Sequence, residues 1–155
     1  MSSGSSSHAS KTVWTGSCLC KAVKYTVTGD PLTFRVCHCE NCRKATGSAF
    51  MSNLFYNADN IRVVQGEDKL KHYADPETWN GAPITRVFCS ECGSNLFLHP
   101  SSKEAVATNT RVVTMGTIDG EVPWVPKTEL WPELRRKWVH GIETRKKSRK
   151  SEAKL

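Results

Sequence analysis

Seven cysteines fall into three short clusters, and their spacing constrains the fold of this chain more than any other feature. The clusters are Cys18-Leu19-Cys20, Cys37-His38-Cys39-Glu40-Asn41-Cys42 and Cys89-Ser90-Glu91-Cys92-Gly93. An odd number of cysteines fits a disulfide framework poorly, and in a reducing compartment such spacings indicate metal binding. The clusters therefore predict a metalloprotein in which thiolates are the ligands.

The spacing within each cluster brings pairs of sulfurs to one side of the chain. Side chains at positions i and i+2 of an extended segment share a face, so Cys18 and Cys20 can reach one ion. The same holds for Cys37 and Cys39. A C-x-x-C segment such as Cys89 to Cys92 forms a tight turn with both sulfurs on one ion, and a glycine directly after it can adopt a positive φ.

Zinc takes four protein ligands when it is structural and keeps one position open when it is catalytic. Seven thiolates divide naturally into four and three, with the two distant pairs closing one site and the middle cluster left open. Periodicity does not establish this pairing. The middle cluster could recruit one of three histidines, and then both sites would be structural and carry no chemistry. The histidines are His38, His99 and His140, and His38 alternates with its neighbours, so we expect it to point away as a hydrogen-bonding partner.

Length and charge suggest one folded unit with two polar ends. The 155 residues suit a single domain. We expect residues 1–11 to be a disordered tail, residues 12–142 to form the zinc domain, and residues 143–155 to be a basic disordered tail. The tail carries six basic and two acidic side chains, so it contributes +4 of the net charge of +7. The folded body is therefore only mildly basic, which disfavours a nucleic-acid-binding domain.

Short alternating, β-branched runs predict a mainly β fold with little helix. Strands are expected over residues 22–27, 50–56, 61–65, 70–73, 85–88, 95–98 and 111–115. A turn is expected over residues 28–31, and loops over 57–60 and 75–83. One helix is predicted over Pro132–Trp138, because proline is favoured at an early helical position.

Longer motifs around the cysteines resemble the glutathione-dependent formaldehyde-activating enzyme family, which also includes centromere protein V. The resemblance covers about residues 13 to 142, and the matching segments are 16–25, 37–48, 88–96, 113–119 and Trp138. It implies a β-tent fold of short strands with zinc-binding turns, and two zinc ions. Cys18, Cys20, Cys89 and Cys92 would hold the structural zinc, and Cys37, Cys39 and Cys42 the catalytic zinc.

The resemblance also implies a zinc-dependent carbon–sulfur lyase similar to S-(hydroxymethyl)glutathione synthase. Such an enzyme joins or cleaves a glutathione-like thiol and a small electrophile such as formaldehyde. Arg43 and Lys44 are candidates for contacts with a glutathione carboxylate, although such a pair is often a solvated surface feature. Two positions depart from the family pattern. Lys21 replaces a usual glycine, and Glu129 replaces the histidine of a Pro-x-x-His pattern.

Two further expectations concern partners and location. The alternative function is a non-enzymatic zinc module that binds chromatin or another acidic partner through its basic tail, since such a run can contact phosphates. No apolar stretch is long enough to span a membrane, and no secretory signal is present, so we expect an intracellular, cytoplasmic protein. The last residues, Ala153-Lys154-Leu155, resemble a peroxisomal signal and make that location an alternative.

Overall fold

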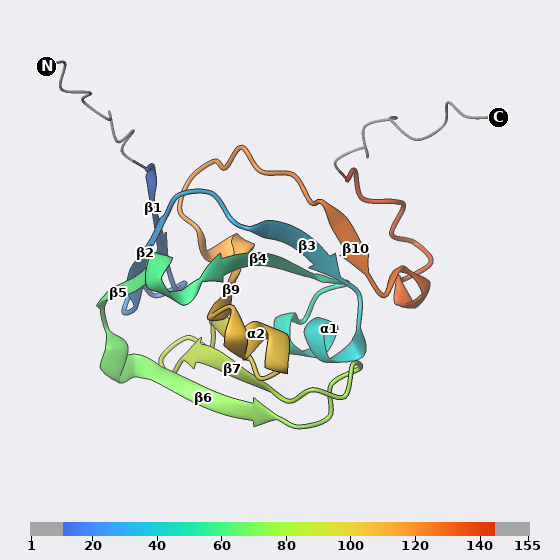
Figure 1. Cartoon of the computed structure of the whole chain (residues 1–155), viewed down its shortest axis with the longest axis horizontal. Coiled ribbons are helices and arrows are strands. Elements are labelled where there is room, and N and C mark those ends of the chain that lie inside the picture. The colour runs from blue at the N-terminus through green and yellow to red at the C-terminus, as the bar shows by residue number, and fades with distance from the viewer. Residues whose placement is uncertain (1–10, 145–155) are drawn as a thin grey trace, which may run out of the picture.

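A computed structural model of the chain describes residues 11–144, and strands dominate it (Figure 1). The strands are β1 Val13–Ser17, β2 Lys24–Thr28, β3 Thr33–Cys37, β4 Met51–Asn57, β5 Ile61–Gln65, β6 Leu70–Asp75, β7 Ile84–Cys89, β8 Asn95–Pro100, β9 Thr110–Thr114 and β10 Thr128–Leu130. Two short α-helices occur, α1 Glu40–Thr46 and α2 Lys103–Ala107, together with single 3₁₀ turns. The predicted mainly β fold with little helix is confirmed.

Every strand expected from alternation is present, with ends that differ by at most two residues. The predicted helix over Pro132–Trp138 is wrong, because only Pro132–Leu134 forms a 3₁₀ turn. Arg135 leaves the helical region with a ψ of 136°, and the following charged residues supply no apolar stripe that could hold a helix against the sheet. Strands β1, β3 and β10 and both α-helices were not predicted.

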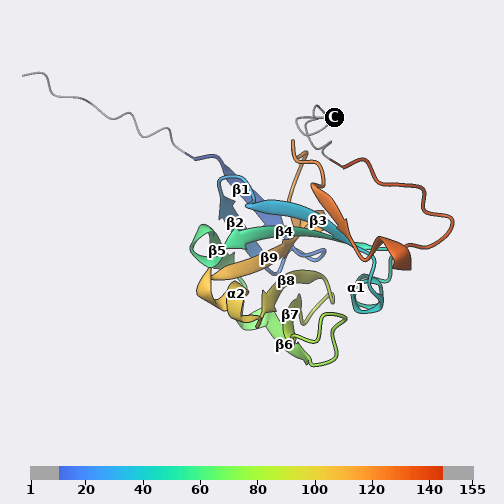
Figure 2. The same ribbon diagram turned by 45° about the vertical axis from the view of Figure 1, so that its right-hand side comes forward.

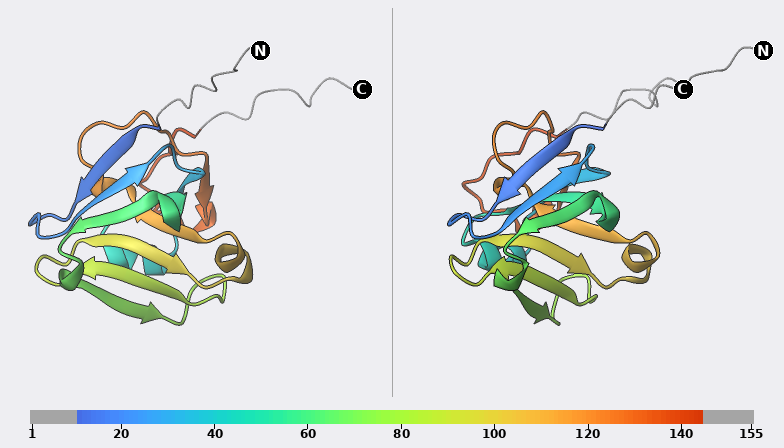
Figure 3. Two further views of the ribbon diagram at one scale, coloured as in Figure 1. Left: turned by 60° about the vertical axis from the view of Figure 1, so that its left-hand side comes forward. Right: turned by 90° about the vertical axis from the view of Figure 1, so that its left-hand side faces the viewer.

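The strands form two antiparallel-dominated sheets of different size. The smaller has the order β1-β2-β5, and the larger has the order β10-β3-β4-β9-β8-β7-β6. Figure 3 shows the smaller sheet lying across the larger one. The only parallel pair among the described residues joins β10 to β3, where Leu130 lies opposite Cys37, and Figure 2 shows β10 beside β3 at the edge of the sheet.

The main core lies between the two sheets. Tyr25 and Val27 from the smaller sheet are buried against strands of the larger one, and the rings of Tyr25 and Phe97 meet edge to face with centroids 4.9 Å apart. Aromatic pairs of this geometry add about 1 kcal/mol beyond the burial of their surface. Tyr25 also covers Gly16, where an added Cβ would lie 2.2 Å from the ring, so this position excludes any larger residue.

Strand alternation gives the larger sheet a second, different face. Phe34, Val36 and Leu54 point into the main core, whereas their neighbours point to the opposite side. On that side a second apolar cluster contains Cys37, Cys39, Cys42, Met51, Leu98 and Val112. The middle cysteine cluster therefore lies on the face of the sheet that the smaller sheet leaves uncovered.

Candidate metal centres and cavity

The first and third cysteine clusters meet at one end of the two sheets. Cys18 and Cys20 lie in the turn that joins β1 to β2, Cys89 ends β7, and Cys92 lies in the turn before β8. All four sulfur atoms lie within 4.8 Å of one another. Cys18 and Cys89 are buried, whereas Cys20 is exposed. This group of four thiols, the four-thiol group, links the two sheets.

Local backbone geometry explains how these turns form. Lys21 follows Cys20 with a φ of 61°, in the left-handed region that favours glycine. Its amide donates to the Cys18 carbonyl across the turn at 2.9 Å. Gly93 takes the equivalent conformation after Cys92, with a φ of 72°. The Ser94 hydroxyl lies 3.2 Å from the Cys92 sulfur and lowers the pKa of that thiol to about 5.

The middle cluster forms a second group, the three-thiol group, where β3 runs into α1. Cys37 ends β3, Cys39 is the N-cap of α1, and Cys42 lies in its first turn. The Cys39 sulfur accepts hydrogen bonds from the Cys37 thiol and from the Cys42 amide, both at 3.4 Å. All three residues are buried, with exposed fractions between 5% and 7%.

Close contact among these thiols shifts their pKa values in different directions. Hydrogen bonds from the Cys37 and Cys42 thiols lower the pKa of Cys39 to about 2. Hydrogen bonding to Cys39 raises the pKa of Cys37 to about 11, and hydrogen bonds to Cys37 and Cys39 raise that of Cys42 still further. Binding a cation with all three sulfurs as thiolates would therefore release protons, so the affinity for metal rises with pH.

Both groups fit zinc by the chemistry and spacing of their donors. Thiolates about 2.3 Å from a tetrahedral zinc ion lie about 3.8 Å from one another. The Cys20 and Cys89 sulfurs are 3.9 Å apart, and Cys18 and Cys20 are 3.5 Å apart. Four donors complete a tetrahedron, whereas three leave one position open. The structure thus groups the cysteines as expected, and the binding of zinc by each group stays a prediction.

The three histidines considered as extra ligands lie elsewhere. His38 is fully buried, and its Nε2 is 3.4 Å from Glu129 Oε1 on the side of β3 that faces away from Cys37. The His99 ring lies beside His72, 6.1 Å between centroids, and His140 is exposed. None joins a group of metal-binding side chains among residues 11–144.

A cavity of about 500 Å³ opens from the three-thiol group across the uncovered face of the large sheet. Alternate residues of several strands line it, which follows from the two-residue period of a strand. They include Thr33, Arg35 and Cys37 of β3, Asn53 and Phe55 of β4, Ile84 and Arg86 of β7, Leu98 of β8 and Val112 of β9. Trp79 and Trp131 also line it, with ring centroids 5.9 Å apart. The four-thiol group is not part of its lining.

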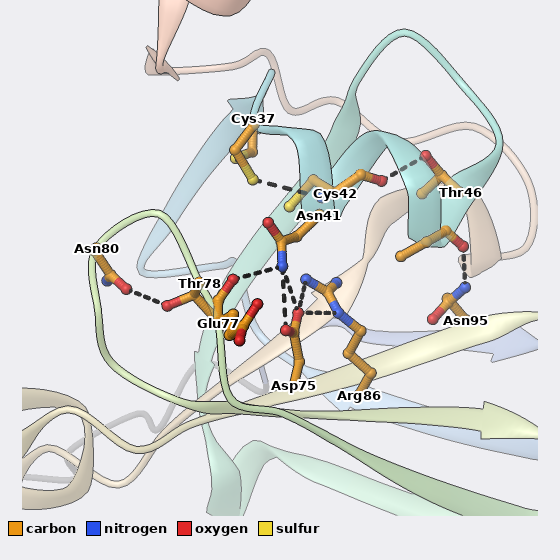
Figure 4. Close-up of polar contacts among 12 residues, drawn as sticks. Cys37, Asn41, Cys42, Thr46, Asp75, Glu77, Thr78, Asn80, Arg86 and Asn95 are labelled. Atoms are coloured by element: carbon orange, nitrogen blue, oxygen red, sulfur yellow. Dashed lines mark hydrogen bonds and ion pairs between the residues drawn. The ribbon is translucent and has the colours of Figure 1, made fainter.

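One buried ion pair holds the floor of this cavity against α1 (Figure 4). Arg86 donates through Nε and Nη2 to Asp75 Oδ2, at 2.9 and 2.8 Å. Asn41, which lies between Cys39 and Cys42, donates through Nδ2 to both oxygens of Asp75 at 3.1 Å. The Asp75 carboxylate therefore connects the helix of the three-thiol group to β7.

The predicted glutathione contacts lie apart from this cavity. Arg43 donates to the Leu134 carbonyl at 2.8 Å, and Lys44 pairs with Glu40 at 2.8 Å on the exposed surface of α1. Neither lines the cavity, so their contact with a carboxylate stays a prediction. The charged residues that do line it are Arg35, Arg86 and Glu104. Sequence reasoning missed all three, because only the pairing of distant strands brings them together.

Comparison with known proteins identifies the family of this chain. The family model described as glutathione-dependent formaldehyde-activating enzyme matches residues 13–133. The chain belongs to this family. A Halomonas elongata relative, named provisionally as a glutathione-dependent formaldehyde-activating enzyme, is 34% identical over 138 residues, which cover 86% of this chain and 83% of that protein.

Two further matches are more distant. An uncharacterized lyase of Schizosaccharomyces pombe is 29% identical over 82 residues, 53% of this chain and 54% of that protein. A crystal structure of a Rhodobacter sphaeroides protein superposes with a TM-score of 0.52 at 23% identity, covering 70% of this chain and 91% of that one. That similarity shows a shared fold.

The two departures from the family pattern have different structural settings. Lys21 takes a backbone conformation that glycine adopts without strain, so the glycine expected at this position would fit there. Glu129 lies in β10 opposite Val36, contacts His38 and pairs with Arg135. Its neighbours Leu130 and Trp131 line the cavity, whereas Glu129 does not. The replaced position therefore lies outside the lining of the cavity that opens from the three thiols.

Proposed function

We propose that this chain is a zinc-dependent carbon–sulfur lyase that joins or cleaves a thiol and a small electrophile at the three-thiol group. One observation carries the proposal. Cys37, Cys39 and Cys42 line a cavity of about 500 Å³, whereas the four-thiol group does not line it and has a full set of donors. A site with three protein donors and access to a cavity is the arrangement of a catalytic zinc centre.

Different residues of the chain have different roles at this site. Cys37, Cys39 and Cys42 would hold zinc, which when bound lowers the pKa of an incoming thiol and keeps it as a nucleophilic thiolate. The apolar side chains of Leu98 and Val112 pack against the three thiols and shield them from water on that side. Dry surroundings strengthen each polar contact with a substrate.

The cavity accepts a thiol that is larger than the reacting atoms. A volume of about 500 Å³ lies within the range of sites for small molecules. Its walls are aromatic and apolar near Trp79, Trp131 and Phe55, with Arg35 as a cation able to meet a carboxylate. Glutathione and formaldehyde are the substrates that the family relationship favours, and the name of the Halomonas elongata relative agrees with them.

The direct test measures catalysis together with metal content. Purified protein is expected to hold two zinc ions and to accelerate the exchange between glutathione, formaldehyde and their adduct, followed by NMR. Replacing Cys42 by Ser should remove one zinc and the acceleration while the fold survives. A protein with two zinc ions that accelerates no small thiol–aldehyde pair would reject the enzymatic proposal.

The alternative function and the location stay predictions. Chromatin binding depends on the basic residues 145–155, which lie outside the described residues, and so does the C-terminal Ala153-Lys154-Leu155. The predicted disordered tails also lie almost entirely outside them. Within residues 11–144, neither α-helix has the length or apolar composition needed to cross a membrane.

A further inference from the structure

Arg86 has a feature that its ion pair leaves unexplained. Its Nε and Nη2 are used by Asp75, but Nη1 has no hydrogen-bond partner within the described part of the chain although it is buried. The whole residue is 7% exposed. Arg35, Arg43 and Arg135 also have an unpaired Nε within the described part of the chain, but only Arg86 is a buried residue. Buried guanidinium donors are usually satisfied, so an unpaired one on a buried residue that lines a cavity points to a ligand atom or a water molecule.

The position of Arg86 brings its side chain to the cavity that the three thiols line. Arg86 lines the same cavity as Cys37, Cys39 and Cys42. Its partner across the strands is Leu98, which packs directly in the cluster with those cysteines. In Figure 4 its guanidinium points toward the helix that carries Asn41 and Cys42. Asp75 fixes this orientation with two hydrogen bonds from Arg86, and Asn41 in turn holds the Asp75 carboxylate.

We propose that Arg86 Nη1 donates a hydrogen bond to the oxygen atom of the electrophile when the thiolate attacks its carbon. This inference rests on the lyase function proposed above and adds the group that polarises the carbonyl. A zinc ion with three thiolate ligands is a weak Lewis acid, so a separate donor is needed for the developing negative charge. Arg86 is suited to this because its guanidinium is always charged and already oriented.

Charge at this end of the cavity favours a neutral electrophile. The negative charge of Asp75 neutralises the positive charge of Arg86. Zinc with three thiolate ligands would carry a net negative charge, so a carboxylate on the electrophile would be repelled here. The oxygen of an aldehyde is neutral before attack and becomes negative only as the carbon–sulfur bond forms. Arg86 therefore stabilises the transition state more than the bound substrate, which is what raises a rate.

The reaction balances without an oxidant or reductant. A lone pair of the thiolate forms the carbon–sulfur bond, and the π pair of the carbonyl moves to oxygen, where Arg86 Nη1 holds it. The oxyanion then takes a proton from water, which replaces the proton that the thiol released to solvent on entering the site. The product is a hydroxyalkyl thioether, and the reverse sequence cleaves it.

Two small ligands distinguish a hydrogen bond from Arg86 to the ligand oxygen from binding through the ligand sulfur alone. Thioacetate carries an oxygen on the carbon attached to sulfur, as the adduct does, whereas ethanethiol has the same heavy-atom skeleton without that oxygen. Isothermal titration calorimetry on the zinc-loaded protein would compare their affinities in wild type, in Arg86→Lys and in Asp75→Asn/Arg86→Met. The double variant removes both charges, so no carboxylate is left buried without a partner.

The double variant is expected to weaken thioacetate binding by about tenfold or more, with little change for ethanethiol, because one charge-assisted hydrogen bond is lost. Arg86→Lys should restore part of the affinity. Equal weakening of both ligands, or no change for thioacetate, would overturn the proposal. If the double variant does not fold, ¹⁵N-arginine NMR of the wild type replaces it. Thioacetate and not ethanethiol should shift the Arg86 guanidinium signal, and equal spectra would overturn the contact.

The outcomes separate this contact from the lyase function. Thioacetate binding that depends on Arg86, in a protein that accelerates no thiol–aldehyde exchange, would support the contact and reject the enzyme. Acceleration together with Arg86-independent binding of thioacetate would reject the contact alone. Failure of both ligands to bind, in a protein that accelerates no thiol–aldehyde exchange, would overturn both proposals, whereas the same failure in a protein that does accelerate it would reject the contact alone.

Discussion

The sulfur atoms of Cys20 and Cys89 lie 3.9 Å apart, although 69 residues separate the two cysteines along the chain. Cys20 belongs to the turn between two strands of the small sheet, and Cys89 ends a strand of the large one. A metal ion shared by them would hold the two sheets together. The three thiols of the other group, by contrast, come from one continuous segment at the end of β3.

Loss of the four-thiol group should therefore cost more stability than loss of the three-thiol group. Structural zinc contributes roughly 10 kcal/mol or more in small zinc domains, which is comparable to the whole stability of a domain. Cys89→Ser is expected to unfold the protein at room temperature. The matched variant Cys42→Ser should lose one zinc and remain folded. Circular dichroism melting with zinc analysis would check this, and similar melting temperatures for both variants would contradict it.

Two glycines with the same backbone conformation test the packing beside the four-thiol group. Gly66 and Gly120 have φ values of 75° and 76°. A Cβ at Gly66 would lie 2.1 Å from the Ala22 carbonyl oxygen, whereas at Gly120 it would meet nothing within 4 Å. Both alanine variants lose about 1 kcal/mol to the left-handed conformation, and the clash at Gly66 adds about 2 kcal/mol.

Urea unfolding of Gly66→Ala and Gly120→Ala would measure this difference directly. We expect a lower midpoint for Gly66→Ala at an unchanged slope. Since Ala22 follows closely after Cys20, the same variant should also release zinc at lower chelator concentrations. Equal midpoints for the two variants would show that the Ala22 segment moves aside without cost.

His99 makes stability depend on pH in the mildly acidic range. Burial lowers the pKa of His99 to about 4, and the nearby charges of Arg111 and His72 act in the same direction. The unfolded chain, with an ordinary histidine pKa near about 6.5, then binds more protons than the folded one between these values. Stability therefore falls as the pH is lowered from about 6.5 to about 4.

The variant His99→Gln isolates this contribution, because all other titrating groups are shared. The difference in unfolding free energy between pH 7 and pH 5 should shrink in His99→Gln by an amount on the order of 1 kcal/mol, since the side chain is only half-buried. Zinc-ligand titration affects both proteins equally and cancels. An identical pH dependence for the two proteins would contradict the assignment to His99.

Trp79 and Trp138, two exposed tryptophans, allow a test of whether the thiol substrate binds in the cavity. Trp79 is 49% exposed and lines the cavity beside Trp131, whereas Trp138 is 72% exposed and lies outside it. Removing an aromatic contact costs about 1 kcal/mol, so Trp79→Ala should raise the KM for the thiol by about fivefold. Trp138→Ala should leave KM unchanged. Steady-state kinetics would decide, and equal effects would place the thiol elsewhere.

Glu129 tests whether the departure from the family pattern affects chemistry. Its carboxylate contacts His38, Arg135 and the Ile142 amide, and it does not line the cavity. Glu129→Gln should lower stability by about 1 kcal/mol through the lost charge on its hydrogen bonds. The kcat of the lyase reaction should stay within about twofold of wild type. A tenfold loss of kcat at unchanged stability would assign Glu129 a role in catalysis.

The alternation of apolar and polar residues predicted most of the strands, because it depends only on residues that are close in sequence. The segment Ile61–Gln65 is a strand with the predicted ends, because its β-branched residues favour extended backbone wherever it packs. Helix α1 escaped prediction because its N-cap is Cys39, a residue that rarely caps helices. Helix α2 did carry a signal, since Ser102 caps it by accepting from the Ala105 amide.

The candidate site could be predicted only where its parts are close in sequence. Cys37, Cys39 and Cys42 lie within one short segment of the sequence, so their spacing alone predicts that they form a group. Asp75 and Arg86 meet because β6 and β7 pair in a particular register, and Asn41 joins them through tertiary packing. No local pattern encodes that register. The donors around the thiols are therefore determined by the sheet as a whole.

The parallel pairing of β10 with β3 has a consequence for the order of assembly. Leu130 lies opposite Cys37, and with Trp131 it forms one wall of the cavity. During translation all four cysteines of the four-thiol group have been synthesised once Cys92 is added. The cavity wall, however, is completed only after Trp131 has been added, so all four donors of the four-thiol group are available to a metal ion before the nascent chain can form the complete cavity.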